Sequence, residues 1–90
     1  MPVLQRQFTI GNKLGLHARA AAKIVKIANQ YRSHIRFLKN GQEADAKSIL
    51  GILTLACPQG CIIEVHVEGD DALEAMDALT SLFESNFGEE

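Results

Sequence analysis

The sequence contains no tryptophan, only two cysteines, and no apolar run long enough to span a bilayer. Small secreted scaffolds usually carry more cysteines, so we expect Cys57 and Cys61 to be reduced thiols. Their spacing, C-P-Q-G-C, differs from C-x-x-C, and no neighbouring ligand cluster completes a metal or redox site. The first residues also lack the basic region and apolar stretch of a signal peptide. These absences predict a cytoplasmic protein with no metal and no membrane partner.

A surplus of positive charge is missing as well. Nine Lys and Arg residues against eleven Asp and Glu residues give a net charge of −2, whereas proteins that bind the nucleic-acid backbone are usually basic. The sequence also lacks paired carboxylates, metal-ligand spacing and a nucleotide-binding loop. We therefore expect neither a nucleic-acid partner nor a cofactor.

The composition is that of an ordinary globular protein, with 47% hydrophobic and 22% charged residues. A chain of 90 residues can bury one modest core. The sequence contains no internal repeat, low-complexity tract or linker. We expect residues 1–90 to form a single domain.

Hydrophobic periodicity predicts the order strand, helix, strand, strand, helix, strand, helix. The expected ranges are 3–10, 18–31, 34–40, 42–46, 49–55, 61–68 and 72–83. Crossover helices make the first two strands run the same way, so an antiparallel sheet requires the fourth strand between them. The pattern predicts an α+β open-faced β-sandwich: a four-stranded antiparallel sheet in the order 1-4-2-3, with three helices on one face.

Local signals mark the ends of several elements. Asn40-Gly41 is typical of a tight hairpin, and Ser48 can cap the helix that follows it. Asp71 and Glu74 match a capping box of the D-x-x-E form. The helix that they open has an expected buried stripe of Ala72, Leu73, Met76, Leu79 and Phe83. We expect residues 88–90 to form a frayed tail.

The segment from Gly15 to Ala22 holds the strongest candidate site. His17 falls at the start of a predicted helix, where unpaired backbone N–H groups and the positive end of the helix dipole converge. A lone histidine there is usually a surface or capping residue, but Arg19 follows two residues later. The combination indicates an anion site.

The same surroundings suit phosphoryl chemistry. They disfavour a positive charge on His17, so we expect a neutral ring at neutral pH that can attack phosphorus. Once a phosphoryl group is attached, the backbone N–H groups of Ala18 and Arg19 and the Arg19 guanidinium can bind its oxygens. The same surroundings of His17 therefore favour both accepting a phosphoryl group and holding it afterwards.

Three landmarks occur in the order found in a known family: Lys13-Leu14-Gly15-Leu16-His17-Ala18-Arg19, Asn40-Gly41 and Ala46-Lys47-Ser48-Ile49-Leu50-Gly51. With them, nearly the whole chain resembles HPr, the histidine phosphocarrier of the phosphoenolpyruvate-dependent phosphotransferase system. The resemblance implies that His17 is phosphorylated on Nδ1, taking phosphate from Enzyme I and passing it to an EIIA protein in sugar transport. It makes Arg19 the charge partner of the phosphate, and the protein a substrate of partner enzymes rather than an enzyme. We also expect a monomer.

Two further features lie in the second helix. The resemblance implies that Ser48 is the regulatory serine modified by an HPr kinase/phosphorylase, although the residues alone favour a helix cap without regulation. A short helix has only one buried stripe, so some apolar side chains must stay exposed beside His17. We expect a docking surface for partner proteins made of Leu16, Ile49, Leu50 and Leu53.

Two other interpretations remain open. One is a regulatory binding module of the same fold that acts through control of partner proteins, and the other is a domain whose helix start holds a free anion or metabolite. Ala20 stands where many HPr proteins have proline, from which we expect little functional consequence. The tail at 82–90 is similar to that of the nitrogen-related paralogue, so the pathway also stays open.

Overall fold

The hydrophobic patterns produce the expected βαββαβα order in the computed structural model, which describes residues 3–89. The elements are β1 (Val3–Thr9), α1 (Ala18–Ala28), β2 (His34–Lys39), β3 (Gln42–Asp45), α2 (Ile49–Thr54), β4 (Ile62–Glu68), α3 (Ala72–Glu84) and a short 3-10 turn, η1 (Asn86–Gly88). In this part of the chain, no helix has the length and apolarity needed to cross a membrane.

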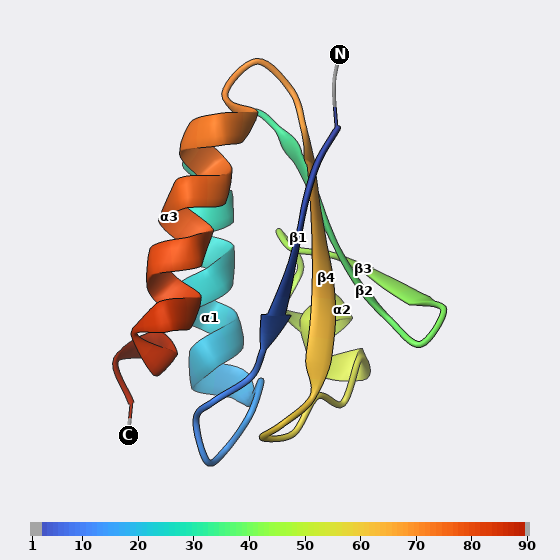
Figure 1. Cartoon of the computed structure of the whole chain (residues 1–90), viewed down its shortest axis with the longest axis vertical. Helices are drawn as coiled ribbons and strands as arrows, with labels where there is room; N and C mark the ends of the chain where they lie inside the picture. Colours follow the sequence, from blue (N-terminus) through green and yellow to red (C-terminus); the bar gives the residue numbers. More distant parts are fainter. Residues whose placement is uncertain (1–2, 90) are drawn as a thin grey trace.

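The four strands pair in antiparallel fashion in the order β1-β4-β2-β3, which confirms the predicted sheet. Side chains alternate between the two faces of each strand, and those of Ile35, Phe37 and Val65 lie fully buried on one face. The helices cover this face, and Figure 1 shows α1 and α3 standing beside each other along it. The opposite face remains open.

The first helix ends earlier than its apolar stripe predicts, at Ala28 rather than Tyr31. Asn29 caps it, with its backbone N–H and its side-chain amide both donating to the carbonyl of Val25. The next backbone bonds, from Gln30 to Ile27 and from Tyr31 to Ala28, span three residues instead of four. The chain has therefore tightened into turns before β2 begins.

The predicted capping box at the start of α3 is wrong. The Asp71 side chain makes no cap bond to its own helix. Its carboxylate instead accepts hydrogen bonds from the hydroxyl and backbone N–H of the buried Ser33 and from the backbone N–H of Arg32. These bonds, led by that from the Ser33 hydroxyl, hold the pKa of Asp71 below its usual value. Asp71 therefore ties α3 to the turn before β2.

The buried stripe of α3 also differs from the prediction at one position. Leu73 is 58% exposed, while Ala75 is fully buried. The other four predicted residues are buried as expected: Ala72, Met76, Leu79 and Phe83. The α3 stripe therefore begins with small side chains, and Leu73 faces outward.

The expectation of free thiols is wrong, because Cys57 and Cys61 form a disulfide. The turn between α2 and β4 places their Cα atoms 5.5 Å apart, inside the range that a disulfide needs. The turn also bonds to the chain that leads into α1. The carbonyl of Cys57 accepts from Leu16 N at 2.8 Å, and that of Cys61 accepts from Ile10 N at 2.8 Å.

Candidate functional site

His17 is the N-cap residue of α1. Its backbone is extended, with φ −79° and ψ 179°, and its carbonyl accepts the first helical hydrogen bond from Ala21 N at 2.9 Å. The N–H groups of the first turn, including those of Ala18 and Arg19, have no acceptor within the helix. The half-buried imidazole, with 24% of its side chain exposed, therefore stands at the positive end of the α1 dipole.

The loop before His17 is held by close backbone packing. Gly15 has a φ of +65°, and a Cβ atom there would lie 2.3 Å from the carbonyl oxygen of Cys57. Only glycine allows both this conformation and this approach. The buried Asn12 donates from Nδ2 to the carbonyl of Gly15 at 2.8 Å. The start of α1 is thus fixed from two sides.

The C-terminal tail returns to the same end of the molecule. After α3, the residues Asn86, Phe87 and Gly88 all have positive φ, which reverses the chain. Phe87 is buried and packs edge-on against Phe83, with ring centroids 5.2 Å apart. Figure 1 shows the red segment that follows α3 at the lower end of the molecule, the end at which α1 begins. The sequence-based expectation of fraying is therefore wrong for Gly88 and Glu89, while Glu90 lies outside the described residues.

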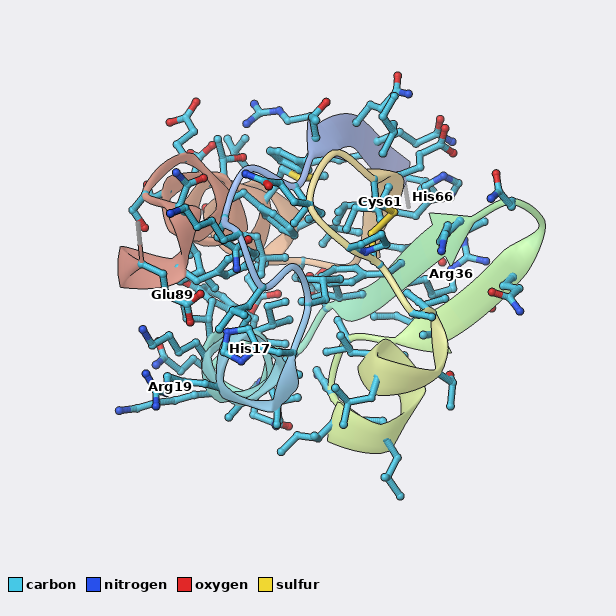
Figure 2. All side chains as sticks on the ribbon, turned by 90° about the horizontal axis from the view of Figure 1, so that it is seen from below. His17, Arg19, Arg36, Cys61, His66 and Glu89 are labelled. Carbon is cyan, nitrogen blue, oxygen red and sulfur yellow. A yellow bond between two sulfur atoms is a disulfide. The ribbon has the colours of Figure 1, made fainter. Side chains whose placement is uncertain are left out.

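Glu89 contacts the His17 ring directly. Its Oε2 lies 2.6 Å from Nε2 of His17, and its Oε1 accepts from Nδ2 of Asn12 at 2.9 Å. The bond from Asn12 is the largest cause that lowers the Glu89 pKa; burial opposes it, and the hydrogen bond with His17 and the charge of Lys23 add to it. Figure 2 shows Glu89 and His17 together at this end of the protein. The carboxylate form is therefore favoured beside the imidazole.

Arg19 occupies the first turn of α1 as expected, but its side chain is exposed. Figure 2 shows it extending away from the His17 ring toward solvent. Within residues 3–89, its guanidinium makes no hydrogen bond or ion pair. The structure therefore places Arg19 next to the site without bringing it onto the imidazole.

Ser48 caps α2 as the sequence predicts. Its Oγ accepts from the backbone N–H of Gly51 at 3.0 Å. We expect Ser48→Ala to lower the free energy of unfolding by about 1 kcal/mol, because an N-terminal N–H loses its acceptor. Urea denaturation tests this, with the exposed Ser81→Ala in α3 as a control that should change little. Equal effects of the two substitutions would contradict the cap's contribution.

The predicted docking residues differ in their exposure. Leu50 is 76% exposed and Ile49 40%, whereas Leu53 is half-buried against the core. The prediction that Leu16 belongs to the docking surface is wrong. Leu16 is only 5% exposed, because its backbone is bonded to Cys57 and its side chain packs in the core. Leu14, two residues earlier and 69% exposed, was not predicted. The exposed apolar side chains near the start of α1 and on α2 are thus Leu14, Ile49 and Leu50.

Sequence reasoning also missed Asn12 and Glu89. Asn12 lies in a polar turn that resembles any surface loop, and its burial depends on packing between distant segments. The tail did carry a signal: the aromatic Phe87 followed by Gly88 is typical of an apolar anchor with a glycine in the left-handed region. The described residues contain no cluster of three or more His, Cys, Asp or Glu side chains that could hold a metal ion.

Comparison with known sequences identifies similar proteins over nearly the whole chain. A family model described as the PTS HPr component phosphorylation site matches residues 4–85. The phosphocarrier protein HPr of Cupriavidus necator is 47% identical over 87 residues, covering 97% of this chain and 98% of that protein. The phosphocarrier protein NPr of Shewanella violacea is 42% identical over 89 residues, covering 99% and 98% respectively.

Solved structures show the same fold. HPr-C-His of Thermoanaerobacter tengcongensis has a TM-score of 0.93 at 45% identity, covering 97% of this chain and 98% of that chain. A structure described as an HPr dimer from the same organism has a TM-score of 0.78 at 46% identity, covering 91% and 94%.

Proposed function

The chain belongs to the HPr family of phosphocarrier proteins of the phosphotransferase system, and we propose that it accepts a phosphoryl group on Nδ1 of His17 from Enzyme I and passes it to an EIIA protein. The observation that supports this most is the position of His17 at the N-cap of α1. There the ring lies beside backbone N–H groups that can bind phosphoryl oxygens. Nε2 is already engaged by Glu89, which leaves Nδ1 for the phosphoryl group.

In the transfer step, the lone pair on Nδ1 attacks phosphorus. A new P–N bond forms, the bond between phosphorus and the donor atom breaks, and its electron pair stays with the donor. The N–H groups of Ala18 and Arg19 then bind the phosphoryl oxygens, and the exposed Arg19 side chain can turn to pair with them. In transfer to EIIA, an acceptor atom of EIIA attacks phosphorus, the P–N bond breaks, and its electron pair returns to Nδ1. The protein is thus a substrate of two partner proteins in turn, rather than an enzyme.

Partner proteins would dock on the exposed apolar side chains. Leu14 and Leu50 are the most exposed of these side chains, Ile49 is 40% exposed, and Leu53 contributes its exposed part. Phosphorylation of Ser48 by an HPr kinase/phosphorylase would add about two negative charges beside this surface and oppose an acidic partner. We propose that the protein works as a cytoplasmic monomer, since an exchangeable carrier needs its docking surface free.

A reconstituted relay tests this function. Purified protein with phosphoenolpyruvate and Enzyme I should gain one phosphoryl group by mass, and adding an EIIA protein should remove it. Sugar-type and nitrogen-type EIIA proteins are compared as acceptors, because both HPr and NPr proteins are similar to this chain. Failure to gain the group from Enzyme I would contradict the proposal, whereas the preferred EIIA identifies the branch.

A further inference from the structure

Resting on the proposed role of His17, we propose that Glu89 is a positioning residue for the imidazole. Its carboxylate keeps the ring proton on Nε2, so that the lone pair stays on Nδ1. It also offsets the positive charge that the ring gains when Nδ1 is phosphorylated. Glu89 lies beyond residues 4–85, the part of the chain that the family model matches.

The hydrogen bond between the two side chains assigns the ring proton. An ionised carboxylate can only accept, so the 2.6 Å contact between Oε2 and Nε2 requires the hydrogen on Nε2. A neutral imidazole carries one N–H, and Nδ1 is then the nitrogen with the free lone pair. Without a partner on Nε2, the ring would populate both tautomers and present the wrong nitrogen part of the time.

The carboxylate is itself held in place by a second side chain. The Asn12 amide donates one hydrogen to Oε1 of Glu89 and the other to the carbonyl of Gly15. Because both of these partners are acceptors, the amide orientation is determined. Asn12 thereby connects the tail to the loop that delivers His17, and only 15% of the Glu89 side chain is exposed.

The backbone of the tail is anchored as well. Glu89 N donates to the carbonyl of Asn86 at 2.9 Å, and Nζ of Lys23, from α1, donates to the carbonyl of Phe87. The Phe87 side chain is 1% exposed and packs on Phe83. These contacts fix the backbone of Glu89 to the core and to α1. The position of Glu89 beside the ring therefore does not depend on its own side-chain hydrogen bonds alone.

Charge supplies the second part of the role. When Nδ1 forms its bond to phosphorus and Nε2 keeps its hydrogen, the ring becomes positively charged. The Glu89 carboxylate then lies against that charge, while the phosphoryl group occupies the other ring nitrogen and the first-turn N–H groups of α1. The two anionic groups are thus separated across the ring.

The test compares Glu89→Ala and Glu89→Gln with Glu84→Gln, a matched control at an exposed glutamate at the end of α3. Long-range 1H–15N NMR of the His17 ring reports the tautomer without any partner protein. In wild-type protein and Glu84→Gln, we expect one tautomer with hydrogen on Nε2, and in Glu89→Ala a mixture of both. The rate of phosphoryl transfer from phosphorylated Enzyme I should fall about 10-fold in Glu89→Ala, by analogy with metal-binding histidines, where losing the group that orients the ring has an effect of this order. Glu89→Gln keeps a hydrogen-bond acceptor but loses the charge. Its transfer rate should therefore lie between those of wild-type protein and Glu89→Ala.

The outcomes separate this role from the proposed function. If wild-type protein takes no phosphoryl group from Enzyme I, the phosphocarrier proposal fails, while the ring spectra still test the tautomer. If wild-type protein is phosphorylated and Glu89→Ala matches it in either the ring spectrum or the transfer rate, the positioning role is overturned and the carrier function stands. Thermal unfolding of each variant verifies that the fold is retained.

Discussion

Replacing His17 by alanine is expected to abolish phosphoryl transfer while leaving the fold intact. The side chain is the attachment point of the phosphoryl group, so its loss removes the covalent intermediate itself, and the rate should fall by more than about 10³-fold. The imidazole contributes little to the core, because it lies at the N-cap and makes no cap hydrogen bond with its side chain. Labelling by phosphoenolpyruvate and Enzyme I measures the effect.

The matched control for this substitution is His34→Ala. His34 is exposed on β2 and should keep the wild-type labelling rate, as a histidine without a role in transfer. Persistent labelling of His17→Ala would show that another side chain carries the phosphoryl group. Loss of labelling in both variants would instead point to a general effect of histidine replacement.

Replacing Phe87 by alanine is expected to give the largest loss of stability, about 3–5 kcal/mol in the free energy of unfolding. Phe87 is 1% exposed and packs edge-on against Phe83, which in turn stacks on Phe8 at a centroid distance of 4.5 Å. Removing the ring leaves a cavity at the end of α3 and releases the anchor of the tail. Urea denaturation measures the loss.

Two variants complete the Phe87 experiment. Leu73→Ala, at the opposite end of α3 and 58% exposed, should change stability by no more than about 0.5 kcal/mol. Phe87→Leu keeps part of the packing and should lose less than Phe87→Ala, which allows the His17 ring to be studied in a protein that is well folded. A Phe87→Ala variant as stable as wild type would mean that the tail is not anchored through the core.

The sheet and its covering helices could be predicted from the sequence because their signals are periodic and local. Alternation in β4 places Ile63, Val65 and Val67 on the buried face. Because β1 and β2 are joined by a crossover helix and run the same way, an antiparallel sheet must place β4 between them. The Ser48 cap is local too, since it joins residues three apart. The position of His17 at the start of α1 could be predicted for the same reason, because the local sequence marks where the helix begins.

The features that were missed or wrong depend on contacts between distant segments. The Asp71 carboxylate faces Ser33 rather than its own helix because the turn before β2 presents three donors to it. Leu16 is buried because its backbone bonds to Cys57, forty-one residues away. Glu89 meets His17 across seventy-two residues of sequence. No periodicity or local motif encodes such distances, so only the folded chain shows these contacts.

The central claim is that the N-cap of α1 and the C-terminal tail together present Nδ1 of His17 as the phosphoryl acceptor. The most direct measurement is 31P and 1H–15N NMR of the wild-type protein after phosphorylation by Enzyme I. We predict that phosphorus is coupled to Nδ1 of His17, with the hydrogen retained on Nε2 beside Glu89. A phosphoryl group found on Nε2, or on any other side chain, would contradict this account.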